Sequence, residues 1–128
     1  MSMAVIMTRS LLTVPVDSTL GEAAGAMVER GVGAVVVLEN DAIAAILTER
    51  DVMKAVAAGK DASAPVTDWM TRHPETIEPA DSTDHAATLM IHGGFRHLPV
   101  VAGGKVVGIV SIRDLMKVAI DDRSPRGV

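Results

Sequence analysis

The sequence has 128 residues, a formal net charge of −4 at pH 7 and 48% hydrophobic residues, which fits one compact folded domain better than two independent ones. It has no cysteine and only 2% aromatic residues. The absence of cysteine excludes disulfides, thiolate metal sites and cysteine nucleophiles. The acidic balance and the scarcity of aromatic side chains argue against nucleic-acid binding, which uses basic surfaces and base stacking. No apolar run approaches the roughly 20 residues that cross a bilayer, and the short run at 3–7 lacks the features of a signal peptide, so we expect a cytoplasmic protein without membrane contact.

The first half of the chain predicts five elements: a short extended segment, an amphipathic helix, two strands joined by a tight turn, and a second helix. They cover, in chain order, residues 13–14, 20–28, 34–38, 42–47 and 49–59. The first helix is predicted from apolar residues that recur at helical spacing. Thr19, three residues before Glu22, predicts a capping box at its start, and Gly31 predicts its end. The two strands are predicted from their β-branched residues.

The second half of the chain repeats the first. The tripeptide Met7-Thr8-Arg9 recurs as Met70-Thr71-Arg72, which is 63 positions later. One residue is inserted near Pro79, and the shift of 63 then returns, so that residues 48–51 fall on residues 111–114. Because identical residues recur in one order at one spacing, the same elements are expected again. The second copy predicts helices and strands at residues 83–92, 97–101, 106–110 and 112–121.

The order strand, helix, strand, strand, helix thus occurs twice, which predicts a mixed α/β (α+β) fold of two pseudo-symmetric repeats. One copy of about 60 residues would be only marginally stable alone, so we expect the two repeats to pack through their sheets. Repeat 1 is assigned to residues 1–62, repeat 2 to 63–121 and a frayed C-terminal tail to 122–128. Small and turn-forming residues at 59–65 predict a linker between the repeats.

Each repeat has a hydroxyl residue followed three positions later by an aspartate, where a strand meets the last helix. These residues are Thr48 with Asp51 and Ser111 with Asp114. A capping box explains both pairs without any ligand. The same position, however, can present N–H groups and a hydroxyl to an anion, and a nearby carboxylate can bond the two hydroxyls of a ribose. One residue can both cap the helix and bind, so both interpretations stay open.

Two copies of this pattern, with the string GFRHLPVV at 94–101 and GIVSIRDL at 108–115, resemble a tandem pair of CBS (cystathionine-β-synthase) domains over about residues 7–120. The resemblance implies a stand-alone regulatory module that acts as a nucleotide sensor in signalling. Its ligands would be adenosine-containing molecules (AMP, ADP, ATP, NAD or S-adenosylmethionine) bound in clefts between the repeats. The resemblance also implies a homodimer, an effector protein of unknown identity, and an adenine nucleotide as regulatory ligand with no required cofactor.

Carried over to this sequence, the resemblance assigns ribose binding to Asp51 and Asp114. It assigns hydroxyl and phosphate contacts to Thr48, Ser111, Arg96, His97, Arg50 and Arg113, and the surround of the adenine to Thr13, Val14, Thr76 and Ile77. For His97 and the two helix-start arginines, an ordinary solvated side chain is the alternative. Repeat 1 departs from the family pattern, because Gly33 and Ala34 stand where repeat 2 has its two basic residues. Equal phosphate sites in the two repeats are therefore not expected.

The remaining residues point to binding rather than catalysis. No metal site is expected, because His85 and His92 are seven positions apart and lack the spacing of helical metal ligands. No nucleophile with a base, no paired carboxylates and no phosphate-loop glycines are present, so we do not expect an enzyme. An interaction scaffold without a ligand is the alternative function. Small and Met-rich helix faces predict the dimer contact, at Ala23, Ala24, Met27, Ala87 and Met90.

Overall fold

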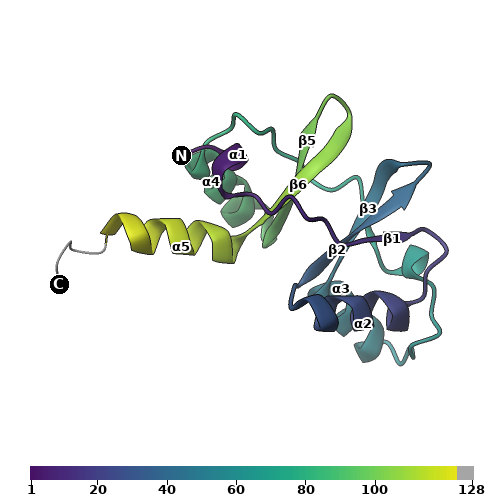
Figure 1. Ribbon diagram of the computed structural model, residues 1–128. Coiled ribbons are helices and arrows are strands. Elements are labelled where there is room, and N and C mark those ends of the chain that lie inside the picture. Colours follow the sequence, from purple (N-terminus) through teal and green to yellow (C-terminus); the bar gives the residue numbers. More distant parts are fainter. Residues whose placement is uncertain (124–128) are drawn as a thin grey trace. The chain divides into compact units, whose positions relative to one another are not determined.

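The computed structural model describes residues 1–123, which form two compact units (Figure 1). One of them, the contiguous unit, is Ser10–Pro74. The other, the composite unit, combines Met1–Arg9 with the chain from Glu75 onward. The mixed α/β fold expected from the sequence is confirmed, but the compact units do not follow the repeat boundaries.

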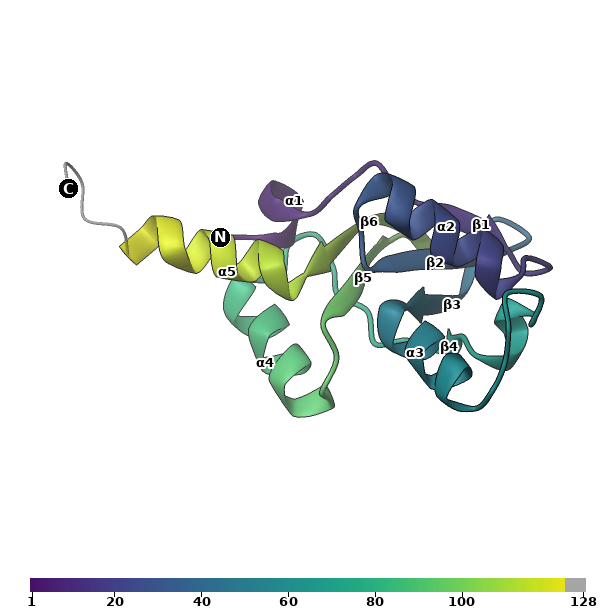
Figure 2. The same cartoon turned by 90° about the horizontal axis from the view of Figure 1, so that it is seen from below.

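The contiguous unit is a four-stranded sheet with two helices. Its elements are β1 (Thr13–Pro15), α2 (Leu20–Arg30), β2 (Ala34–Glu39), β3 (Ala42–Thr48), α3 (Glu49–Ala57), the 3₁₀ helix η1 (Val66–Asp68) and β4 (Thr71–Arg72). The strand order is β1-β2-β3-β4, with β1 parallel to β2 and the other pairs antiparallel. Helices α2 and α3 contact each other and pack on β2 and β3 (Figure 1, Figure 2). The two helices and two strands predicted for residues 20–59 are confirmed, with ends shifted by no more than two residues.

Helix α2 begins and ends where the sequence predicts. Thr19 and Glu22 form a capping box, and Gly31 ends the helix in the left-handed region at φ 69°. The segment predicted as a linker also contributes, because the carbonyls of Ala62 and Ala64 accept hydrogen bonds from the first N–H groups of α2. Within this segment, the hydroxyl and backbone N–H of Ser63 donate to Asp61 and hold the pKa of that carboxyl below its usual value.

The composite unit repeats the arrangement around a two-stranded hairpin. Its elements are α1 (Met3–Ile6), α4 (Thr83–Gly93), β5 (His97–Ala102), β6 (Lys105–Ser111) and α5 (Ile112–Arg123). Strands β5 and β6 pair antiparallel. Isolated bridges extend this hairpin on both sides, from Ile77 to Val100 and from Thr8 to Ile109. The helices and strands predicted for residues 83–121 are therefore confirmed.

The repeated Met-Thr-Arg tripeptides explain why the compact units differ from the repeats. In the contiguous unit, Thr71–Arg72 forms β4 and pairs with Ala45 and Ile46 of β3. In the composite unit, Thr8 pairs with Ile109 of β6, which is the position 63 residues after Ile46. Each tripeptide thus lies beside the last strand of the other repeat. Sequence reasoning missed α1, η1 and β4, which all lie in or next to these exchanged segments.

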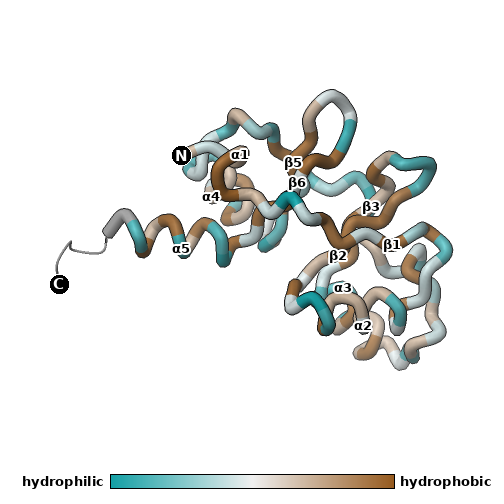
Figure 3. The backbone as a smooth tube through the Cα atoms, in the orientation of Figure 1, coloured by the Kyte–Doolittle hydropathy of each residue, from teal (hydrophilic) through white to brown (hydrophobic). Residues whose placement is uncertain are grey.

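Each unit has its own hydrophobic core, and the strands that supply it appear brown in Figure 3. The contiguous core consists of Val14, Leu20, Ala23, Met27, Val35, Val37, Ala45, Leu47, Ala55, Val66 and Met70. The composite core consists of Met3, Met7, Ile77, Ala86, Met90, Leu98, Val100 and Val110. Met3 and Met7 of the N-terminal segment are therefore core residues of the composite unit. No helix in the described part of the chain has both the length and the apolarity to cross a bilayer.

Two expectations from the sequence need correction. The predicted tail at 122–128 begins too early, because α5 continues to Arg123, and residues 124–128 lie outside the described part. The predicted dimer face is also wrong in part, because Ala23, Met27 and Met90 are buried in the cores of their own units. Their apolar character is explained by packing within the chain.

Candidate functional site

The start of α3 carries the first predicted ligand pair, Thr48 and Asp51. The backbone N–H of Thr48 donates to Oδ2 of Asp51 at 3.0 Å, and the backbone N–H of Asp51 donates to the Thr48 hydroxyl at 3.3 Å. This reciprocal pair is a capping box. Asp51 is only 7% exposed and also accepts a hydrogen bond from the hydroxyl of Thr71 in β4. The capping interpretation of this motif is therefore confirmed.

The start of α5 carries the second pair, Ser111 and Asp114, with the same backbone geometry. The N–H of Ser111 donates to Oδ2 of Asp114 at 2.8 Å, and the N–H of Asp114 donates to the Ser111 hydroxyl at 3.2 Å. The Ser111 hydroxyl in turn donates to the same Oδ2 at 3.1 Å. Oδ1 of Asp114 has no hydrogen-bond partner among residues 1–123, and the side chain is half-buried. One carboxylate oxygen is thus available at this site.

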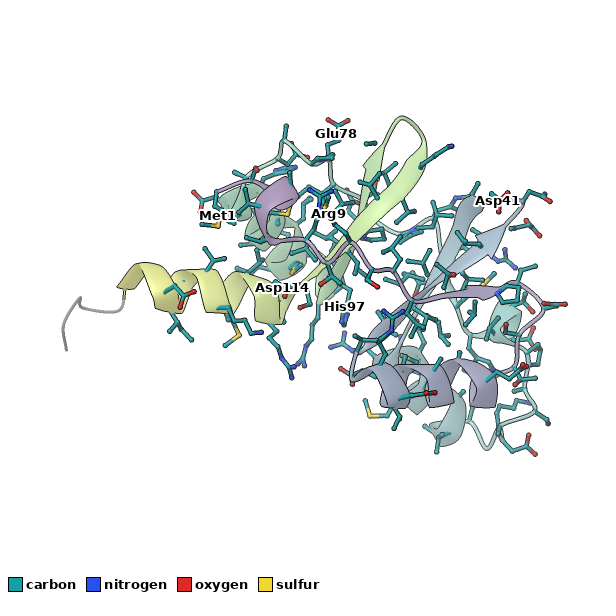
Figure 4. All side chains as sticks on the ribbon, in the orientation of Figure 1. Met1, Arg9, Asp41, Glu78, His97 and Asp114 are labelled. Carbon is teal, nitrogen blue, oxygen red and sulfur yellow. The ribbon has the colours of Figure 1, made fainter. Side chains whose placement is uncertain are left out.

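The composite unit brings the predicted basic residues to this same helix start. The register of the β5–β6 hairpin places His97 opposite Ser111, and the carbonyl of Arg96 accepts the N–H of Ile112, the first residue of α5. Figure 4 labels His97 and Asp114, which lie near each other where β5 begins and β6 ends. Arg96 is exposed and His97 half-buried. A carboxylate, a hydroxyl, an arginine and a histidine therefore share one corner of this unit.

The contiguous unit has the same backbone corner without the basic side chains. Ala34 lies opposite Thr48, and the carbonyl of Gly33 accepts the N–H of Glu49. This geometry makes Gly33 and Ala34 the structural equivalents of Arg96 and His97, as the sequence repeat implies. The corner at Thr48 and Asp51 therefore lacks the positive charges that the corner at Asp114 has.

The residues predicted to surround an adenine fall into two classes. Val14 and Ile77 are buried in the cores of their units, so their side chains are occupied by packing. Thr13 and Thr76 are exposed beside them. A ligand lying against these segments would therefore meet the threonines rather than the buried aliphatic side chains.

The other predicted residues are on the surface. Arg50 and Arg113 are exposed on the first turns of α3 and α5. His85 and His92 are exposed on α4. Within residues 1–123, no group of His, Asp and Glu side chains could hold a metal ion.

Thr71 was not among the residues predicted to form a site. Its hydroxyl lies 3.4 Å from Oδ1 and 3.3 Å from Oδ2 of Asp51. The repeat of the Met-Thr-Arg tripeptide was the available signal, but the sequence alone does not show which strand the tripeptide joins. The pairing of β4 with β3 is what carries Thr71 to Asp51.

The chain is a duplicated α/β unit, and each copy has a capped aspartate at the start of its last helix. Comparisons with known proteins identify the family that has this architecture. Residues 4–58 and 66–121 each match the CBS domain model. CBS domain-containing protein YhcV of Bacillus subtilis is 36% identical over 110 residues, which cover 85% of this chain and 79% of that protein. The chain therefore belongs to the CBS domain family.

Solved structures agree with this assignment. The CBS-domain containing protein ATU1752 from Agrobacterium tumefaciens has a TM-score of 0.83 at 39% identity, with 88% of this chain and 91% of that chain covered. The CBS domain protein PAE2072 from Pyrobaculum aerophilum, complexed with AMP, has a TM-score of 0.84 at 28% identity, with 93% of this chain and 98% of that chain covered. The resemblance noted in the sequence is thus confirmed at the level of family and fold.

Proposed function

We propose that this protein is a regulatory module that binds an adenosine-containing ligand, with the corner at Asp114 as its principal site. The observation that carries the proposal is the grouping of Ser111, Asp114, Arg96 and His97 at one helix start, with Oδ1 of Asp114 free of partners in the described part of the chain. The AMP complex of PAE2072, 28% identical to this chain, supports an adenine nucleotide as the ligand.

The chemistry of this corner suits a nucleotide. A ribose diol offers two O–H donors, and a carboxylate with an available oxygen accepts such donors through charge-assisted hydrogen bonds. Arg96 supplies a permanent positive charge and His97 a further donor for phosphate oxygens. The Ser111 hydroxyl is engaged with Asp114 in the helix cap, so binding without turnover is the function that this corner favours.

Ligand binding is tested by thermal melts of the purified protein with AMP, ADP, ATP, NAD and S-adenosylmethionine. A ligand present at about 100 times its dissociation constant stabilises the native state by about 2.7 kcal/mol, so the binding ligand raises the melting temperature by several degrees. Analysis of small molecules released when natively purified protein is denatured identifies a ligand that is retained. If no ligand at millimolar concentration moves the midpoint, the protein is an interaction scaffold instead.

We also propose that the protein is a cytoplasmic homodimer that signals to an effector protein. Support for the dimer comes from large apolar side chains that remain exposed on the helices, including Val28, Met53, Ile91 and Met116. A ligand that favours one arrangement of the two units, or of the two protomers, over another would change the surface that the effector meets.

A further inference from the structure

The two aspartates of the proposed sites differ in the hydroxyl groups that donate to them. Asp51 receives the Thr71 hydroxyl on both carboxylate oxygens, at 3.4 and 3.3 Å. Thr71 is held there because β4 pairs Thr71 with Ile46, two residues before the end of β3. Both oxygens of Asp51 therefore have a partner within the chain, and the residue is 7% exposed.

The matched residue of the other repeat makes no such bond. Thr8 is the equivalent of Thr71, and its backbone pairs with Ile109 of β6 as expected from the repeat. Within residues 1–123, however, the Thr8 hydroxyl donates no hydrogen bond to Asp114. Besides the two basic side chains that only the Asp114 corner has, the two corners therefore differ in the bond that one threonine hydroxyl makes, while the backbone pairing is shared.

We propose that Thr71 is an affinity-setting residue that occupies the Asp51 carboxylate in the ligand-free protein and lowers the nucleotide affinity of that site. This inference rests on the proposed function, because it assumes that a ribose uses these carboxylates. A ribose that binds at Asp51 competes with the Thr71 hydroxyl for the same oxygens, whereas a ribose at Asp114 finds Oδ1 available. Asp114 therefore fills first as the ligand concentration rises, and Asp51 fills only at higher concentration.

The size of the effect follows from the geometry. An O–H···O hydrogen bond is usually about 2.7–2.8 Å long, so the shared contacts at 3.3 and 3.4 Å are weak. A carboxylate can accept about four hydrogen bonds in open solvent, but the carboxylate of a residue that is only 7% exposed offers fewer directions to a ligand. Removing a bond of this strength from the ligand-free state is expected to raise the affinity about two- to tenfold.

The test is calorimetric titration with AMP, carried out on variants in which the aspartate of the other corner is replaced, so that each titration measures binding at one corner. Asp114→Asn isolates the Asp51 corner, and Asp51→Asn isolates the Asp114 corner. Thr71→Val in the first background is expected to tighten AMP binding about two- to tenfold, because valine keeps the β-branched shape and removes the donor. The matched control, Thr8→Val in the second background, is expected to leave AMP binding unchanged.

A further variant distinguishes competition by the Thr71 hydroxyl for the Asp51 carboxylate from a purely structural role of Thr71. Thr71→Ser keeps the hydroxyl and is expected to restore wild-type affinity in the Asp114→Asn background. If Thr71→Val fails to fold, as its ligand-free melt would show, Thr71→Ala replaces it with the same expectation. Unchanged or weaker AMP binding in a folded variant without the hydroxyl overturns the inference while leaving the proposed function intact. If the wild-type protein binds none of the five adenosine-containing ligands tested in the thermal melts, the proposed function and this inference are both wrong; if it binds another of them but not AMP, that ligand replaces AMP in these titrations with the same expectations.

Discussion

In an aspartate three residues after a helix N-cap, one carboxylate oxygen accepts hydrogen bonds from the cap residue. The other oxygen can accept a hydrogen bond from another group. At Asp114, Oδ2 takes both donors from Ser111, the N–H at 2.8 Å and the hydroxyl at 3.1 Å. This leaves Oδ1 for a ligand, so capping and ribose binding do not compete for the same atom. The two interpretations of the motif, which the sequence leaves open, are compatible at this residue.

Asp114→Asn separates these two roles. Loss of a charge-assisted bond of about 1.5–3 kcal/mol is expected to weaken nucleotide binding on the order of 10-fold to 150-fold. The asparagine carbonyl oxygen can still accept from Ser111, so the free energy of unfolding should fall by no more than about 0.5 kcal/mol. Calorimetric titration and ligand-free melts measure the two quantities. Unchanged affinity with a lowered melting point would mean that Asp114 is only a cap.

At the scale of elements, the N-terminal segment is part of the composite unit. Thr8 exchanges two backbone hydrogen bonds with Ile109, at 2.8 and 3.0 Å, and Met7 packs beside Gly108. A Cβ added at Gly108 would lie 2.7 Å from Sδ of Met7 and 3.0 Å from the carbonyl oxygen of Thr8. The methionine side chain can move, but the paired backbone cannot move without loss of its hydrogen bonds.

Gly108→Ala is therefore expected to lower the free energy of unfolding by about 1–3 kcal/mol, the usual cost of overpacking. Denaturant unfolding measures this, and faster trypsin cleavage after Arg9 would report that the segment has loosened. Gly25→Ala is the control, because nothing lies within 4 Å of the added methyl group and alanine is the better helix former, worth about 0.5–1 kcal/mol. Equal effects of the two substitutions would show that residues 1–9 do not dock on Gly108 as described.

The N-terminal segment also illustrates which elements of the fold can be predicted from the sequence and which cannot. Helices α2 to α5 were predictable because each is long enough to show apolar residues at helical spacing or begins with a capping motif. The duplication of the sequence gave independent support for these helices. Helix α1 has four residues and β4 has two, which is too short for a periodic pattern. Their place is fixed by pairing with strands distant in the sequence, so Thr71 could not be assigned to Asp51 before β3 and β4 were seen together.

At the scale of the whole molecule, two pairs of exposed apolar residues are related by the duplication. Val28 is 82% exposed and Ile91, 63 positions later, is 75% exposed. Met53 is 66% exposed and its counterpart Met116 is 57% exposed. These positions replace Ala23, Met27 and Met90 of the faces proposed from the sequence, which are core residues. Because both units expose apolar side chains at equivalent helix positions, we propose these side chains as contacts of the proposed dimer.

The dimer proposal predicts that Met53→Glu and Met116→Glu each weaken self-association. Burial of one large apolar side chain contributes about 1.5–3 kcal/mol, so its replacement by a charge should raise the dimer dissociation constant at least about tenfold. Analytical ultracentrifugation or light scattering across micromolar concentrations measures this constant. Lys54→Glu is the matched control, because it changes the charge next to Met53 at a residue that is already polar and exposed, and a small effect is expected. A monomeric wild-type protein at micromolar concentration, with and without nucleotide, would overturn the dimer proposal. Equal weakening by Lys54→Glu would show that charge rather than apolar burial governs the association.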